Sequence, residues 1–379
     1  MAGATPVPNA GSGISIVVPT HGRVALVGRL LDSLAAATAG LDGAAEVIVV
    51  DSSTGVDAAA IRESCRAAGA RYEVGDTSVR RKRNRGIELA EQPIVLFIDS
   101  DCAATPTLIS EHLRGYDDPR VAGVAGVTRF TGRDSWLWRV IERTSFLDSF
   151  SFAARERSLP WAPTCNVSYR REVLRAVDGF HTAFPFRLGA DDVDLGLRVT
   201  AAGHLIRGNP AAVVEHARET WSGVGLMAWR AFRWGRMHVH LHARHPERVF
   251  ADFPRWPVLF LLVGIVAMAV AVLRQRPAFL LAPLAWGALA LAFEALLAPP
   301  VLGARWRDVP LELAARLLGL VYEAGTTVEA LRLGRFPVLV REVSYTPPSL
   351  RGRNRRIAQV WGAVLALLAL LAAGWLACA

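Results

Sequence analysis

The chain has 379 residues, of which 52% are hydrophobic, and its formal net charge at pH 7 is +9. Arginine supplies nearly all of the positive charge and no nucleic-acid recognition module accompanies it, so we expect an anionic membrane or a phosphorylated substrate as partner and no nucleic acid. The four cysteines are scattered without a C-x-x-C pair, which excludes a disulfide framework and a zinc site and fits a reducing cytosol.

The amino-terminal part of the chain alternates between short apolar runs and helical stretches. Residues 1–12 carry neither the basic nor the apolar region of a signal peptide, so we expect a flexible lead-in. Strand patterns follow at 14–20 (ISIVVPT), 45–53 (AEVIVVDSS), 70–76 (ARYEVGD) and 93–101 (PIVLFIDSD), and helical patterns at 24–39, 57–68 and 78–90. This alternation, with continuous Val and Ile runs, predicts an α/β fold whose mostly parallel, Rossmann-like sheet is covered on both faces.

Polar residues end three of these strand patterns. The first strand ends at Thr20 and His21, the second at Asp51, and the fourth at Asp99 and Asp101. Ligands of such sheets bind beyond the carboxyl ends of the strands. We therefore expect these side chains to converge on one cleft.

The stretch Asp99-Ser100-Asp101 follows a strand that reads as fully buried, where unpaired carboxylates would be costly. Two carboxylates on one turn can present oxygens to a hard cation such as Mg²⁺ or Mn²⁺, with the diphosphate of a substrate as a further ligand. The basic helix at 78–90 precedes this strand. A solvated charged face accounts for most of its basic residues, and Arg83 and Asn84 are the ones we place near the phosphates.

A second acidic cluster occupies Asp191, Asp192 and Asp194, just before a helical pattern. Helix capping and the helix dipole account for one or two of these acids. A third facing the cleft can act as a general base toward an acceptor hydroxyl. His216 follows another short strand and is a candidate metal ligand, with a supporting role beside the ligands or a plain surface position as the alternatives.

Long apolar runs appear only in the last third of the chain. We expect a transmembrane hairpin at 257–298, a basic cytoplasmic loop with amphipathic interfacial helices at 299–356, and a transmembrane helix at 357–379. This arrangement predicts a multi-pass protein of the inner (cytoplasmic) membrane with its catalytic domain in the cytoplasm. Buried helices of a soluble protein are the alternative, and the basic RQR at 274–276 conflicts mildly with this orientation.

Six motifs in order carry a resemblance to a known family: ISIVVPTHGR, VIVVDSS, RKRNRGIELA, FIDSDC, NVSYRREVLRAVDGF and GADDVDLGLRV. Together they resemble the family 2 inverting glycosyltransferases of the GT-A fold, over about residues 13–250. The resemblance implies a GT-A catalytic domain, followed here by the transmembrane and interfacial helices. It also implies a nucleotide-diphosphate sugar as donor.

The resemblance carries site roles onto particular residues. Asp192 looks like the catalytic base, with Asp191 in place of the family's usual glutamate beside it. Donor-binding roles are implied for Pro19, Thr20, Asp51, Arg83, Asn84, Asp99, Ser100, Arg233 and Trp234. Metal-binding roles are implied for Asp99, Asp101 and His216, and acceptor-binding roles for Asn166 and Asp194.

The predicted activity is metal-dependent, inverting transfer of the sugar to a hydroxyl of a lipid-linked or cell-envelope glycan acceptor. The segment RAFRWGRMHVHLHARHP at 230–246 is also similar to mycofactocin-type glycosyltransferases. Transfer to a polyprenyl phosphate and a processive polysaccharide synthase are further alternatives. Arg230 stands where the processive enzymes have glutamine, which weakens the last. A non-catalytic membrane scaffold on the same fold is the rival outside the enzymes, and a nucleotidyltransferase is disfavoured because no glycine-rich phosphate loop is present.

Overall fold

The computed structural model describes residues 13–347 apart from 42, 186–188, 252–254 and 303–304. It divides the chain into two compact units: residues 1–133 with 147–222, and residues 134–146 with 223–379. The predicted flexible lead-in at 1–12 and the predicted transmembrane helix at 357–379 lie outside the described residues. The boundary expected at residue 250 falls within the second unit, because the helix that follows residue 223 packs on a later helix of that unit.

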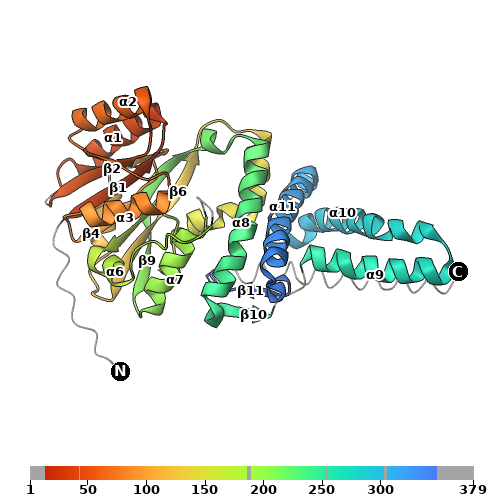
Figure 1. Cartoon of the computed structure of the whole chain (residues 1–379). Helices are drawn as coiled ribbons and strands as arrows, with labels where there is room; N and C mark the ends of the chain where they lie inside the picture. Colours follow the sequence, from red (N-terminus) through yellow and green to blue (C-terminus); the bar gives the residue numbers. More distant parts are fainter. Residues whose placement is uncertain (1–12, 42, 186–188, 252–254, 303–304, 348–379) are drawn as a thin grey trace. The chain divides into compact units, whose positions relative to one another are not determined.

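The first unit is built on one mixed sheet, in the order β3-β2-β1-β4-β8-β6-β9-β5, with β7 also paired to β9 (Figure 1). Its strands are β1 Ile14–Thr20, β2 Ala45–Asp51, β3 Arg71–Val74, β4 Ile94–Phe97, β5 Cys102–Ala104, β6 Val121–Thr131, β7 Ser158–Leu159, β8 Val167–Arg170 and β9 Leu205–Ala217. Strands β3, β2, β1 and β4 run parallel, whereas β8 is antiparallel to both β4 and β6. The predicted α/β class with a mostly parallel sheet is confirmed.

Helices cover this sheet, and its central strands β1 and β4 are mostly apolar. Every residue of β1 and of β4 is buried. The helices of the first unit are α1 Val24–Thr38, α2 Gly55–Ala67, α3 Val79–Leu89, α4 Leu108–Arg114, α6 Arg171–Ala176 and α7 Asp191–Ala201. Leu30 and Leu34 of α1 pack in one core cluster with Ile16 and Leu96, so the parallel strand ends are held rigidly.

The second unit is helical, with α5 Trp136–Arg143, α8 Val224–Arg244, α9 Trp256–Arg274, α10 Ala282–Leu302, α11 Val309–Leu333 and a small sheet of β10 Val249–Ala251 and β11 Arg341–Val343. Short 3₁₀ helices across the chain cover Ser145–Ala154, Arg218–Trp221, Pro246–Arg248, Pro277–Leu281, Trp306–Asp308 and Phe336–Leu339. Helices α8 and α11 touch backbone to backbone. A Cβ at Gly235 would lie 1.8 Å from the carbonyl oxygen of Tyr322, so only glycine permits this crossing.

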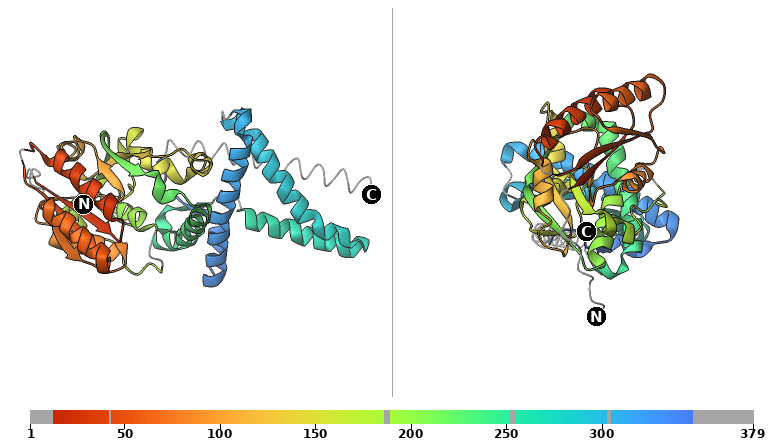
Figure 2. Two further views of the ribbon diagram at one scale, coloured as in Figure 1. Left: turned by 90° about the horizontal axis from the view of Figure 1, so that it is seen from above. Right: turned by 90° about the vertical axis from the view of Figure 1, so that its left-hand side faces the viewer.

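Two apolar stretches, Trp256–Arg274 of 19 residues and Pro277–Leu296 of 20 residues, are long enough to cross a membrane. Helices α9 and α10 follow each other as a hairpin (Figure 2). Trp256 of α9 packs against Trp286 of α10. Outside this contact, large apolar side chains such as Leu261, Ile265 and Leu273 are exposed. Glu294, the acid within the hairpin, is buried with its carboxylate 3.8 Å from the Arg316 guanidinium of α11.

Candidate active site

The turn after β1 and the turn after β2 are tied together by hydrogen bonds. The Gly22 amide donates to the Ser53 hydroxyl at 2.7 Å, and the Ser52 amide donates to the Thr20 carbonyl at 3.2 Å. Gly22 and Arg23 both adopt positive φ angles, 63° and 62°. For Arg23 this conformation costs on the order of 1 kcal/mol. The turn is therefore held in one defined and slightly strained shape at the start of α1.

Asp51 ends β2 and is fully buried beneath these turns. One of its oxygens accepts hydrogen bonds from the Ser53 amide at 2.8 Å and the Ser53 hydroxyl at 2.5 Å. The other accepts from the Tyr72 hydroxyl at 3.1 Å. Pro19, the preceding candidate on β1, lies in register with Val50 and is buried.

The basic helix α3 does not present most of its charges to solvent, as a plain solvated face would. Arg80, Lys82 and Arg83 are only 1%, 4% and 6% exposed. The helix lies close against β1, since a Cβ at Gly86 would sit 2.2 Å from a methyl group of Val17. Lys82 and Arg83 find oxygen partners at the carboxyl ends of the strands, whereas Arg80 donates to the Gly189 carbonyl at 3.0 Å, just before α7.

Lys82 reaches both strand-end turns from α3. Its ammonium donates to the Thr20 carbonyl at 2.5 Å and to the Ser52 hydroxyl at 2.9 Å. Burial lowers the pKa of Lys82 to about 8, with the nearby Asp51 carboxylate acting in the opposite direction. Through these two hydrogen bonds, Lys82 links the carboxyl ends of β1 and β2.

Asp99 and Asp101 are each neutralised by an arginine. The Arg83 guanidinium donates to Asp99 at 3.0 Å, and the Arg23 guanidinium donates to Asp101 at 2.7 Å. Ser100 between them is buried. Two guanidinium groups therefore offset the cost of placing two carboxylates after a buried strand.

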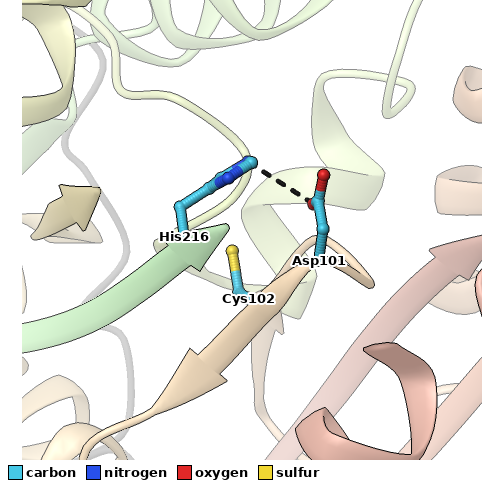
Figure 3. Close-up of side chains that lie close together, drawn as sticks. All are labelled: Asp101, Cys102 and His216. Atoms are coloured by element: carbon cyan, nitrogen blue, oxygen red, sulfur yellow. Dashed lines mark ion pairs between the residues drawn. The ribbon is translucent and has the colours of Figure 1, made fainter. Parts of the chain in front are cut away.

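Asp101 also faces His216, which β9 brings opposite Cys102 of β5 (Figure 3). The His216 Nδ1 lies 3.2 Å from the Ala217 carbonyl, an acceptor, so this nitrogen carries the hydrogen. The Nε2 then offers a lone pair, and it faces an Asp101 oxygen 3.4 Å away. Two electron-rich atoms aimed at one space fit a divalent cation between them, with Cys102 as the third potential donor in this cluster.

The three acids at the start of α7 have different environments. Asp191 accepts from the Arg83 guanidinium at 2.7 Å and lies 3.8 Å from the Arg80 guanidinium. Asp194 is fully buried and accepts from Arg198 at 2.9 Å. Asp192 is half-buried and accepts from the Val193 amide at 2.9 Å, and among the described residues no basic side chain forms an ion pair with it.

Asp192 also has the most unusual acidity of the three. Burial, and then the neighbouring Asp191 carboxylate, raise the pKa of Asp192 to about 7, and Arg83 opposes this rise. A carboxyl group with a pKa near neutrality accepts a proton readily at physiological pH. The geometry thus sets Asp192 apart from Asp191 and Asp194, which hold α7 in place through their arginines.

Two candidate asparagines use their side chains to position the backbone. The Asn84 amide donates to the Phe180 carbonyl and accepts from the Phe180 amide, each at 2.8 Å, so it holds the segment that leads to α7. Asn166 is buried and donates to the carbonyls of Val127 and Ala212, each at 3.0 Å, while its oxygen faces His112 at 2.9 Å. In this structure both amides are committed to the protein itself.

Arg233 and Trp234 lie on α8, in the second unit. The Arg233 guanidinium lies over the Trp229 ring at 4.2 Å, and the Trp234 ring packs against Phe146 with centroids 5.2 Å apart. Their assignment to donor binding stays a prediction. The remaining candidates, from Pro19 to His216, lie in the first unit.

The sequence alone predicts no specific role for Arg23, Arg80 or Lys82. Lys82 had a signal, since it is the single lysine among 43 basic residues. Arg23 follows a glycine directly after a strand end, where a helix begins, which marks a turn near a ligand site. Arg80 offered no signal apart from its spacing of three residues from Arg83 on one helix face.

Comparison with known proteins places this site in a family. The model of the family described as Glycosyltransferase like family 2 matches residues 10–236. Validoxylamine A glucosyltransferase of Streptomyces hygroscopicus subsp. jinggangensis is 26% identical over 239 residues, covering 55% of this chain and 54% of that protein. Pre-mycofactocin glycosyltransferase of Mycobacterium tuberculosis is 30% identical over 178 residues, covering 44% of this chain and 35% of that protein.

The chain thus spans about half or less of the length of these curated relatives. Among solved structures, a mannosyltransferase from Pyrobaculum calidifontis, in complex with GDP-Man and Mn²⁺, matches with a TM-score of 0.55 and 22% identity, over 85% of this chain and 89% of that chain. That likeness supports the GT-A-like fold. Because the family model covers more than half of the chain, the protein belongs to the family 2 glycosyltransferases and is a glycosyltransferase enzyme.

Proposed function

We propose that this glycosyltransferase moves a sugar from a nucleotide-diphosphate donor to a hydroxyl of a membrane-proximal acceptor, with inversion at the anomeric carbon and with a divalent cation. The observation that carries the proposal is the contrast at the start of α7. Of its three acids, only Asp192 is both half-buried and outside the arginine ion pairs of the described residues. A base must be accessible to the substrate, and Asp192 fulfils this condition.

The donor site is proposed at the carboxyl ends of β1, β2 and β4. The nucleoside end belongs with Thr20 and Asp51, where the two turns are tied together, and the diphosphate end with Arg83 and Asp99. The mannosyltransferase of similar fold is in complex with GDP-Man and Mn²⁺, which supports a nucleotide-sugar donor here. A transfer assay with different nucleotide sugars identifies the nucleotide and the sugar.

Asp101 and His216 would hold the divalent cation, Mg²⁺ or Mn²⁺, with Asp99 beside them. The facing Asp101 oxygen and His216 Nε2, 3.4 Å apart, fit this group because both are electron donors aimed at one space. When bound, such a cation offsets the negative charge that develops on a departing diphosphate. The protein supplies the ligands on β9 and on the turn after β4, which are rigid parts of the sheet.

Asp192 is proposed to move the proton of the reaction. The acceptor hydroxyl oxygen forms a bond to the anomeric carbon as the bond from that carbon to the diphosphate oxygen breaks. The electron pair of the broken bond stays on the diphosphate, and the hydroxyl proton passes to an Asp192 oxygen. The raised pKa of Asp192, about 7, makes its carboxylate a stronger base than an ordinary aspartate. Asp191 and Arg83 position it from the adjacent site.

The apolar hairpin of α9 and α10 is proposed to insert in the inner membrane, with the basic segment at 299–356 on the cytoplasmic side. Support comes from the two stretches of sufficient length and from their exposed leucine and isoleucine side chains. An enzyme anchored in this way meets lipid-linked or envelope glycan acceptors. Two relatives are named for validoxylamine A and for pre-mycofactocin, so an acceptor of that kind, in place of a membrane-bound one, is the second candidate.

The test is a transfer assay with the full chain in membranes, offered UDP-, GDP- and dTDP-sugars in turn, with products identified by mass. Asp192→Asn is expected to lower turnover by about 10²–10⁴-fold while donor binding is kept. In the wild type, kcat should rise with pH to a plateau above about 7, because the base works when ionised. Asp117→Asn, at an exposed carboxylate paired with Arg207, is the control and should leave turnover unchanged.

Unchanged turnover of Asp192→Asn would remove this residue from the base role. Full activity in excess EDTA would contradict the cation requirement. A product extracted with lipid supports the membrane-proximal acceptor, whereas a water-soluble glycoside favours the second candidate.

A further inference from the structure

Arg23 is the counterion of Asp101, and this pairing suggests that Arg23 affects how the cation binds. Asp101 is nearly fully buried, and one of its oxygens accepts from the Arg23 guanidinium at 2.7 Å while the other faces His216 at 3.4 Å. The carboxylate proposed to hold the cation is thus already paired with a positive charge. A divalent cation and a guanidinium so close to one carboxylate repel each other.

The two arginines beside Asp99 and Asp101 differ in their freedom to move. The Arg83 side chain is 7% exposed, and its two terminal guanidinium nitrogens are paired with Asp99 and Asp191. The Arg23 side chain is 39% exposed, and Asp101 is the carboxylate that it pairs with. Arg23 projects from the strained turn at the start of α1, so its long side chain can leave Asp101 while its backbone stays in place. Arg83 has no comparable route.

We propose that Arg23 is an exchangeable counterion, which the divalent cation displaces from Asp101 and which then pairs with the diphosphate of the donor. This inference rests on the proposed function. Arginine recognises phosphate oxygens through paired N–H groups, so the released guanidinium finds a new anion when a donor binds. Arg23 thereby weakens binding of the cation alone and makes cation and donor bind cooperatively.

The two possible roles of Arg23 predict opposite changes in cation affinity when its charge is removed. If Arg23 merely held Asp101 in the correct orientation for the cation, removing its charge would weaken cation binding. If Arg23 competes with the cation, removing its charge strengthens binding in the absence of nucleotide. A partly exposed ion pair of this kind corresponds to about 2- to 5-fold in affinity.

The measurement is Mn²⁺ binding to the full chain in detergent, followed by the electron paramagnetic resonance signal of free Mn²⁺. Arg23→Met keeps an apolar stem in place of the arginine and removes the charge, and we expect its Mn²⁺ affinity to exceed that of the wild type by about 2- to 5-fold. With GDP or UDP present, the nucleotide should strengthen Mn²⁺ binding less in the variant than in the wild type. Arg29→Met, an exposed arginine on the same helix, is the matched control for net charge.

Equal or weaker Mn²⁺ binding by Arg23→Met overturns the exchange. A gain of the same size in Arg29→Met also overturns it, because the effect would then come from net charge. Absence of Mn²⁺ binding by the wild type, both with and without GDP or UDP, contradicts the cation site itself, and the proposed cation requirement fails with it. Arg23→Lys, which keeps the charge, should stay near the wild type.

Discussion

The two units of the chain distribute their charged and apolar side chains in opposite ways. In the first unit, arginines, a lysine and carboxylates are buried together at one end of a sheet, as Arg80, Lys82, Arg83, Asp101 and Asp191 show. In the second unit, the hairpin exposes apolar side chains such as Leu261 and Leu273. The first arrangement gathers buried charged groups at the proposed donor site. The second suits an apolar environment such as the interior of a membrane.

The largest expected effect on stability comes from removing the buried charge of Arg83 in the first unit. Arg83→Met leaves Asp99 and Asp191 without their shared partner, and we expect a loss of about 3–5 kcal/mol in unfolding free energy. Urea denaturation gives the size, and hydrogen exchange should show the loss first in α3 and α7. Arg81→Met, at a side chain that is 64% exposed, is the matched control and should change stability by about 0.5 kcal/mol or less. Equal losses in both variants would contradict the special burial of Arg83.

An ionised side chain in α9 tests the other half of the comparison. Ile265 and Val56 are both exposed, at 57% and 86%, but Ile265 lies in the hairpin and Val56 at the start of α2. Ile265→Arg should disfavour membrane insertion by about 2.5–3.5 kcal/mol and move protein from the membrane fraction to the soluble or aggregated fraction. Val56→Arg should change neither. If Ile265→Arg stays fully in the membrane after carbonate washing, α9 is not the inserted element.

A smaller effect is expected from acid on the first unit. His112 is buried among Ser168 and Asn166, each 2.9 Å from a ring nitrogen, and burial lowers the pKa of His112 to about 4. Because the folded state holds the proton less tightly than the unfolded chain, the stabilisation is complete above about pH 6.5 and is lost as pH falls toward 4. We expect about 1–3 kcal/mol over this range. Denaturation at several pH values should show a shallower slope in His112→Gln, and an unchanged slope would assign the acid sensitivity elsewhere.

The fold could be predicted because its signals are local. Continuous apolar runs such as Ile14–Thr20 mark buried strands, and alternation with helices sets the parallel order, which the structure confirms. The positions of Asp51 and Asp99 at strand ends follow from the same pattern. Their roles in the reaction stay predictions.

The partners within the site could not be predicted in the same way. Whether an arginine of a basic helix faces solvent or a carboxylate depends on how close the helix lies to the sheet, which Gly86 decides by contact with Val17. Arg23 and Asp101 meet only after folding. Asn84 and Asn166 read as free polar groups in the sequence, yet their amides are bound to backbone that arrives from distant segments.

The single lysine of the chain gives the site a natural chemical label. Lys82 is the one side-chain amine in the sequence, since every other basic side chain is an arginine or a histidine, and it is only 4% exposed. With a pKa of about 8, Lys82 loses its proton under mild alkaline conditions, in which ordinary lysines stay charged. Biosynthetic incorporation of isotope-labelled lysine would therefore place one magnetic resonance reporter between the ends of β1 and β2, where the proposed binding of a nucleotide can be followed without a radioactive sugar.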